Sequence, residues 1–309
     1  MKNRQGFALV IVLILVALLT GITVLFITDV QQETGSNRNS INSVQGGLFA
    51  EGGIEGALQL LSFTLGANDY TTLEDTWAKP ILLEEEQGRL LVTIIDESGK
   101  LNLNTVVLPN GMLNEPYNKM MRNLFRIQQL PEDMVDAIAD WIDLGDTPNP
   151  SGAETDWYRS QRPFIKPRNG YMLTVDELNR IKGFDGDTVD KLRPFVTVYA
   201  EGQLGSPASP ININTAPREV LAALDENMSL SLADRIIEHR KTNPFKNPAE
   251  LVQVPGMSSI ATALSTSIST KGYVYRILAE ATVGDTVRVI EAVARFAGST
   301  PYIIYWREF

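Results

Sequence analysis

The chain has 309 residues, with 27 Lys and Arg side chains against 37 Asp and Glu side chains, and so a formal net charge of −10. This acidic balance argues against a protein that holds nucleic acid by bulk electrostatic attraction. The sequence has no Cys and one His, which excludes disulfides, thiolate nucleophiles and zinc sites built from several His side chains. Carboxylate chemistry, binding of Ca²⁺ or Mg²⁺, and interaction surfaces remain as candidate functions.

An apolar segment begins close to the N-terminus. Residues 7–28 carry no charged side chain; Lys2 and Arg4 precede them and Asp29 follows. About 20 apolar residues are enough to cross a bilayer as a helix, and the apolar core of a cleavable secretory signal is shorter. The flanking charges predict a single pass through residues 7–28, with the N-terminus in the cytoplasm and the bulk of the chain outside. On hydropathy alone, a plain signal anchor is an alternative.

The junction between the leader and the apolar segment is more specific. A short basic leader, residues 1–6, ends in Gly6 and is followed directly by Phe7. This junction resembles a type IV prepilin signal, which implies that a prepilin peptidase cuts between Gly6 and Phe7 and methylates the new N-terminus. Ile11 stands at the fifth mature position, where most pilins and pseudopilins carry Glu. Because a buried carboxylate is costly without a partner, its absence fits a subunit with no neighbour above it, at a filament tip.

The segments after the anchor predict a long helix followed by strands. The helical pattern continues into the first domain and is weakened in its middle by glycines: Gly46, Gly47, Gly52 and Gly53. Residues 89–95 and 100–104 are predicted to form a hairpin around a turn at residues 96–99. Near the end of the chain, residues 273–281 and 286–296 predict a second hairpin. A further strand is expected at residues 302–306.

The middle of the chain predicts a helical block. Its expected helices are residues 117–128, 131–142, 174–182, 185–195, 216–225, 230–241 and 247–254. The predicted fold class is therefore α+β, with the long N-terminal helix packed on an antiparallel sheet and a large all-α domain inserted. The expected divisions are a leader at 1–6, a transmembrane and assembly helix at 7–28, the first part of a pilin-like domain at 29–110, the inserted α domain at 111–270 and the last pilin-like strands at 271–309.

The leader, the missing Glu and the helical insertion together resemble the minor pseudopilin K family of the type II secretion system (general secretion pathway protein K). Further family-like segments are residues 139–143, 152–154, 210–216 and 245–251. The resemblance implies a subunit anchored in the inner membrane, with its bulk in the periplasm, that moves to the tip of the pseudopilus. There it would join other minor pseudopilins of the I and J types, with the H type as a further candidate. This complex would start assembly on the inner-membrane platform and support export of folded proteins across the outer membrane.

Residues 175–184 and 213–257 resemble helix–hairpin–helix (SAM-like) repeats. DNA-binding repeats of this kind hold a phosphate with the N–H groups of the hairpin. A membrane-anchored periplasmic DNA-binding protein of an uptake system is therefore the alternative function. Asp185 lies in the first hairpin and Ser258 replaces a glycine in the second, and the nearby basic cluster is small. No nucleic-acid partner is expected, and the repeats are interpreted as packing units reused as an interaction scaffold.

Oxygen ligands are concentrated between residues 140 and 156, where Gly and Pro make the chain irregular and free its carbonyl groups. Ca²⁺ takes six to eight oxygen ligands in flexible geometry. The spacing is not that of an EF-hand, so a solvated acidic loop is an alternative, but the family resemblance implies a structural calcium ion in the α domain. The predicted ligands are Asp143, Asp146, Glu154 and Asp156, with Asp140 as either a ligand or a supporting group.

No enzymatic role is expected from the sequence. The acidic cluster could serve glycoside hydrolysis, which uses paired carboxylates. The aromatic residues available for a sugar platform are Trp141, Trp157 and Tyr158, and core or loop packing explains them better. The sequence also has no G-x-S-x-G, P-loop or G-x-G-x-x-G motif.

Overall fold

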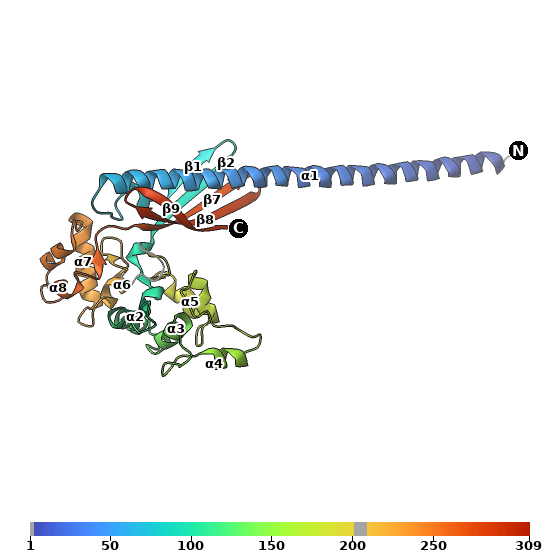
Figure 1. Ribbon diagram of the computed structural model, residues 1–309. Coiled ribbons are helices and arrows are strands. Elements are labelled where there is room, and N and C mark those ends of the chain that lie inside the picture. The colour runs from blue at the N-terminus through green and yellow to red at the C-terminus, as the bar shows by residue number, and fades with distance from the viewer. Residues whose placement is uncertain (1–2, 201–208) are drawn as a thin grey trace.

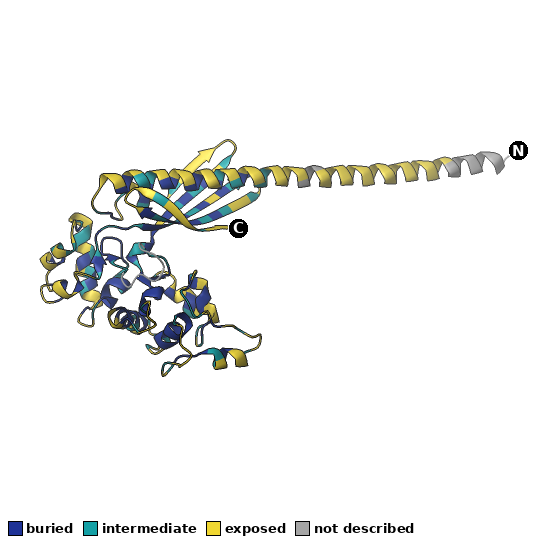
Figure 2. Cartoon of the chain, in the orientation of Figure 1, coloured by how far each residue is buried: buried dark blue, intermediate teal, exposed yellow. Residues whose placement is uncertain are grey.

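A single long helix dominates the computed structural model. The model describes residues 3–200 and 209–309, with side chains described outside residues 3–11 and 34–36. Helix α1 (Asn3–Ala67) projects freely over its first half and lies along a sheet over its second half (Figure 1). From Val12 onward it is long and apolar enough to cross a membrane, by length and composition. Its free half is exposed wherever it is described (Figure 2), as expected for a segment that awaits a bilayer or other helices.

The sheet is antiparallel and has the strand order β1-β2-β7-β8-β9. Its strands are β1 (Ile81–Glu85), β2 (Gly88–Asp96), β7 (Val274–Val283), β8 (Thr286–Ala297) and β9 (Thr300–Glu308). Alternate apolar side chains of β2, β7 and β8 face α1, since side chains in a strand point to opposite faces in turn. The predicted C-terminal hairpin and final strand are confirmed, as is the packing of the long helix on an antiparallel sheet.

The predicted hairpin of residues 89–95 and 100–104 is wrong. Strand β2 pairs instead with β1 on one side and with β7 on the other. After β2 the chain turns away from the sheet through the short 3-10 helix η2 (Glu97–Gly99), whose N-cap, Asp96, accepts a hydrogen bond from the Ser98 N–H. Strand β1 was missed because its Leu and Glu residues lack the β-branched character that marks strands.

Helix α1 runs without interruption through the glycines that were expected to weaken it. A Cβ atom at Gly53 would lie 3.0 Å from Val92 Cγ2 and 3.2 Å from the Ala279 Cβ, and one at Gly46 would lie 3.1 Å from Arg288 Cγ. These glycines let the helix approach the sheet closely. The packing against the sheet offsets their low helix propensity, which is about 1 kcal/mol each.

The segment between β2 and β7 is largely helical and has a hydrophobic core separate from that of the sheet. Its α-helices are α2 (Glu115–Ile127), α3 (Met134–Ile142), α4 (Thr155–Ser160), α5 (Gly186–Leu192), α6 (Arg218–Ala223), α7 (Leu230–Thr242) and α8 (Ala261–Leu264). The 3-10 helices of the chain are η1 (Thr76–Ala78), η2, η3 (Leu103–Val106), η4 (Val175–Arg180) and η5 (Pro248–Gln253). The helices expected at 174–182 and 247–254 are thus 3-10 helices.

The helical segment consists of a first unit, residues 101–199, and a second unit, residues 211–271, which begin alike. The first starts Leu-Asn-Leu-Asn-Thr and the second Ile-Asn-Ile-Asn-Thr. Each start forms one strand of a short parallel ladder within its own unit. In the first, β3 (Leu101–Asn102) pairs with β4 (Val196–Thr197); in the second, β5 (Ile211–Asn212) pairs with β6 (Ile268–Ser269). The inserted segment is therefore not all-α as expected, because each unit also contains a short parallel β ladder.

The second Asn of each start ties its unit together in the same way. The Asn104 amide donates to the carbonyls of Met172 and Val198, and its Oδ1 accepts the Met172 N–H. The Asn214 amide makes the same set of bonds with Phe245 and Thr270.

The units differ mainly in one loop. The Asn104–Met172 separation is 68 residues, whereas the Asn214–Phe245 separation is 31, so this part of the first unit is 37 residues longer than its counterpart. Most of the difference lies in residues 143–171, between the end of α3 and Met172, which we call the insertion loop. In the second unit, only residues 243–244 separate α7 from Phe245.

Candidate metal centre

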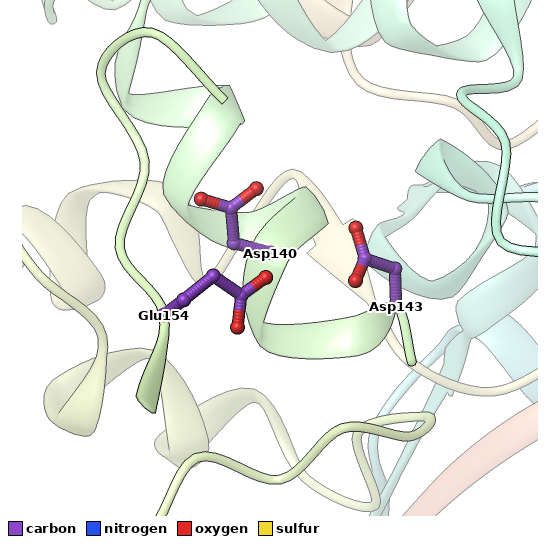
Figure 3. A group of neighbouring side chains, drawn as sticks. All are labelled: Asp140, Asp143 and Glu154. Carbon is purple, nitrogen blue, oxygen red and sulfur yellow. The ribbon is translucent and has the colours of Figure 1, made fainter. Parts of the chain in front are cut away.

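Acidic side chains meet where α3 ends and the insertion loop begins. Asp140 lies in the last turn of α3, Asp143 directly follows that helix, and Glu154 precedes α4. One carboxylate oxygen from each lies within 4.8 Å of the others. Figure 3 shows the Asp143 and Glu154 carboxylates turned toward each other, with Asp140 beside them. Asp140 and Asp143 share a face because they are three residues apart in a helical turn.

Glu154 is the most perturbed member of this cluster. It is 4% exposed, and neither of its carboxylate oxygens has a hydrogen-bond partner among the described residues. Its burial, together with the negative charges of Asp143, Asp140 and Asp146, raises its pKa to about 8. Burial also raises the pKa of Asp140 and of Asp143. A bound cation would satisfy these oxygens and remove the mutual repulsion, so the donor set fits a metal ion.

Asp140 holds the loop as well as facing the cluster. Its carboxylate accepts the Asn149 N–H at 3.1 Å and the Asn149 side-chain amide at 2.5 Å. A Cβ atom at Gly152 would lie 1.8 Å from Asp140 Oδ2, so only glycine fits there. The sequence left the role of Asp140 open, and the structure gives it supporting contacts and a place among the clustered oxygens.

Two of the predicted ligands, Asp146 and Asp156, lie outside the clustered oxygens. Asp156 is not among the clustered oxygens: its side chain is 96% exposed and its Oδ1 lies 3.4 Å from Arg159 Nη1. It lies in the first turn of α4, whereas Glu154 is the extended N-cap of that helix, so the two side chains leave the backbone in different directions. Asp146 is exposed in the loop and also lies outside the cluster, although its charge acts on Glu154.

The aromatic residues beside the cluster support it from within the core. Trp141 and Tyr158 are buried and meet edge to face at 5.3 Å between ring centres, and Trp157 packs on Tyr158 at 4.9 Å. Lys182 Nζ donates to the Gly152 carbonyl at 2.8 Å and lies over the Trp157 ring. Because Trp141 and Tyr158 are buried, they cannot form the sugar platform that a glycosidase would need.

The chemistry of the cluster suits a hard cation. Its described donors are carboxylate oxygens, the type that Ca²⁺ prefers. Ca²⁺ needs six to eight ligands, which leaves room for backbone carbonyls and water. A catalytic pair of carboxylates would need an open substrate cleft, whereas the oxygens of Glu154 are buried.

The hairpins suspected of binding DNA have their polar groups engaged internally. Asp185 accepts the Thr188 N–H and so caps α5, leaving a carboxylate where a phosphate would have to approach. In the basic cluster of the second unit, Arg240 is turned inward and donates to the Ile213 and Ala216 carbonyls. Lys241 pairs with Glu238 at 2.6 Å. These contacts leave little cationic surface for a nucleic acid.

The predicted processing and assembly residues lie in the first turns of helix α1. The backbone of Gly6, Phe7 and Ile11 belongs to helix α1, but their side chains lie outside the described residues.

Comparisons with known proteins agree with the two-unit division. Family models described as type II secretion system (T2SS), protein K, match residues 99–201 and 211–271, which together are more than half of the chain. The type II secretion system protein K of Pseudomonas aeruginosa is 26% identical over 94% of this chain and 88% of its own length. That of Aeromonas hydrophila is 27% identical over 72% of this chain and 71% of its own.

A solved structure shares the fold. A chain in the crystal structure of the GspK–GspI–GspJ complex from enterotoxigenic Escherichia coli superposes with a TM-score of 0.77 at 19% identity. The match covers 89% of this chain and 99% of that one. The chain therefore belongs to the type II secretion system protein K family and is a minor pseudopilin of that system.

Proposed function

We propose that this minor pseudopilin forms the tip of the pseudopilus together with I-type and J-type minor pseudopilins, with an H-type subunit as a further candidate. The carrying observation is helix α1, which joins a free apolar half to a half that packs on the sheet (Figures 1 and 2). Such a helix presents its apolar side chains to a bilayer first and to other subunits' helices later. The related solved chain was crystallised with GspI and GspJ, which supports the choice of partners.

The position at the tip follows from the shape of the periplasmic part. The helical units lie on the side of the sheet opposite α1 (Figure 1). A subunit within a filament must pack against neighbours above and below, and this added bulk is most easily accommodated at the end. Ile11, in place of the usual Glu, leaves no buried charge that needs a subunit above it. The role is structural rather than catalytic: it starts assembly and supports export of folded proteins.

The inferred life history starts in the inner membrane. Residues 7–28 span the bilayer once, with the bulk of the chain in the periplasm. The prepilin peptidase removes residues 1–6 and methylates Phe7, and the inner-membrane assembly platform then receives the subunit. A structural calcium ion held by Asp143 and Glu154 fixes the insertion loop, which has little core of its own.

The helical units are proposed to be helix–hairpin–helix-like modules inserted into a pilin-like domain. In each unit a 3-10 helix is followed by a glycine in the left-handed region: Gly183, at φ +87°, after η4, and Gly256, at φ +93°, after η5. Each glycine leads into a short helix, α5 or α8, and then into the closing strand. This matched order supports repeated packing modules that present a surface for protein contacts.

The decisive measurement is the intact mass of the chain purified from its native membrane, with and without the processing peptidase. The expected product begins at N-methylated Phe7, and substitution of Gly6 by a bulky residue should leave the leader attached. A wild-type chain that keeps residues 1–6 in the presence of the peptidase would contradict the proposal. Co-purification of I-type and J-type subunits with the processed chain tests the partners separately.

A further inference from the structure

The fold of the first unit does not require the insertion loop. The second unit makes the same parallel ladder and the same Asn-centred bonds without it. Within the loop, Leu144 is 77% exposed and Phe164 is 57% exposed. A long segment that exposes large apolar side chains is more readily explained by contact with another molecule than by folding alone.

A basic basin lies at the end of this loop, where it returns to η4. Its volume is about 460 Å³, and its lining includes Lys166, Pro167, Arg168, Tyr171, Glu177 and Arg180. Tyr171, which is half-buried, supplies apolar surface between the charged groups, whereas Pro167 is buried. All the residues that line the basin belong to the first unit and none belongs to α1, so packing of α1 against other helices does not involve them.

The charges of the basin are unevenly satisfied. Glu177 accepts the Leu173 N–H at 2.7 Å and pairs with Arg168 Nη1 at 3.1 Å. Arg168 also donates to the Tyr171 carbonyl, so the Arg168–Glu177 pair is neutral and fixed. Lys166 and Arg180 are both exposed, and neither has a hydrogen bond or ion pair with any residue that the structure describes. They form the uncommitted positive charge of the basin.

This local charge is opposite to that of the chain. Residues 159–182 contain six Lys and Arg side chains against two acidic ones, in a protein with a net charge of −10. An acidic segment would be attracted here and repelled by most of the remaining surface, so it would bind at this site in preference to others. Two uncommitted cations are too few to hold a nucleic acid, because such binding draws on many phosphate contacts.

We propose that this basic basin, formed by the insertion loop and η4, is a docking site for an extended acidic segment of a protein partner. Carboxylates of the segment pair with Lys166 and Arg180, and its backbone lies over Tyr171. This inference goes beyond the tip function and does not depend on it, because the basin lies outside α1.

The test is fluorescence anisotropy of the full chain in detergent, with a short labelled peptide of alternating Glu and Ser as the probe. The Lys166→Glu/Arg180→Glu variant should bind the peptide about tenfold more weakly, since two favourable pairs become repulsive. The control variant Lys119→Glu/Lys191→Glu makes the same change in net charge at exposed positions outside the basin. Its affinity should stay within about twofold of wild type.

Several outcomes overturn the proposal. These are equal losses in the two charge-reversed variants, equal binding of a Gln-for-Glu peptide, no binding by the wild type, or tighter binding of a DNA duplex than of the peptide. Should the reversed variant lose its helical circular dichroism, Lys166→Gln/Arg180→Gln removes the charges more gently. That variant should still weaken binding about threefold, and unchanged binding would likewise reject the site.

Discussion

Asn104 and Asn214 occupy equivalent positions in the two helical units, where each amide side chain bonds the backbone of its own unit at two distant points. Both side chains are buried, at 3% and 2% exposure. Each bond joins segments far apart in the sequence, so the amide closes its unit as a cross-link would. A buried amide of this kind contributes most through the groups that it prevents from being left unpaired.

Replacement of either Asn by Ala is expected to lower the free energy of unfolding by about 3 kcal/mol, because it leaves buried backbone groups without partners. Asn179→Ala is the matched control, since that side chain is exposed and makes a local bond. It should change stability by less than about 0.5 kcal/mol. Urea unfolding followed by circular dichroism measures all three variants. A loss at Asn104 no larger than that at Asn179 would show that the shared bonds carry little stability.

Helix α1 and the hairpin of β7 and β8 could be predicted from the sequence because their signals are local. Unbroken hydropathy predicts α1, and the turn at residues 282–285 sits between β7 and β8, as their alternation predicts. The partner of β2 could not be found this way, since β7 lies about 180 residues further along the chain. Pairing at that distance depends on tertiary packing, which a local sequence pattern does not reveal.

The repeat is visible in the sequence, because residues 102–105 and 212–215 share the order Asn-x-Asn-Thr. This shared order stands at the start of both parallel ladders. For the acidic cluster, composition singled out Asp143 and Glu154, whose carboxylates the structure brings close together with that of Asp140. It could not exclude Asp156, because the direction of that side chain depends on where α4 begins.

Gly53 and Gly52 provide a contrast within one turn of α1. Gly53→Val should lower the free energy of unfolding by about 2 kcal/mol, because its Cβ would already press on Val92 and Leu90. Gly52→Ala should raise stability by up to about 1 kcal/mol, since nothing lies within 4 Å of the added atom and Ala favours the helix. Thermal unfolding of the two variants checks the pair. Equal effects would mean that α1 does not approach the sheet as closely as described.

The Glu154 carboxyl predicts an unusual pH dependence for the metal-free chain. Its pKa is raised from 4.5 to about 8, so between these values the folded state keeps a proton that the unfolded state releases. Stability with a chelator present should therefore fall as the pH rises from about 4.5 to 8. Glu154→Gln should remove this part of the slope, whereas Glu226→Gln, at an exposed position, should keep it. Urea unfolding across this pH range is the measurement, and identical slopes in both variants would contradict the assignment.

Substitutions of the clustered acids should weaken Ca²⁺ binding, whereas substitution of Asp156, which lies outside the cluster, should not. Asp143→Asn and Glu154→Gln each remove a charged oxygen ligand and should weaken Ca²⁺ binding at least about tenfold in isothermal titration calorimetry. Asp156→Asn should leave the affinity within about twofold, because its carboxylate points to Arg159. Asp140→Asn should weaken binding about tenfold, because its carboxylate supports the site by holding Asn149.

Removal of the ion should also change the stability of the chain. Chelation should lower the melting temperature of the wild type and expose the insertion loop to proteolysis, since ligand binding to the folded state stabilises it. The Glu154→Gln chain should show a smaller response to chelation, and the Asp156→Asn chain the full one. Should Asp156→Asn abolish binding while Asp143→Asn preserves it, the cluster of Asp140, Asp143 and Glu154 would not be the calcium site. The ion would then have to bind around α4, where Asp156 and Arg159 lie.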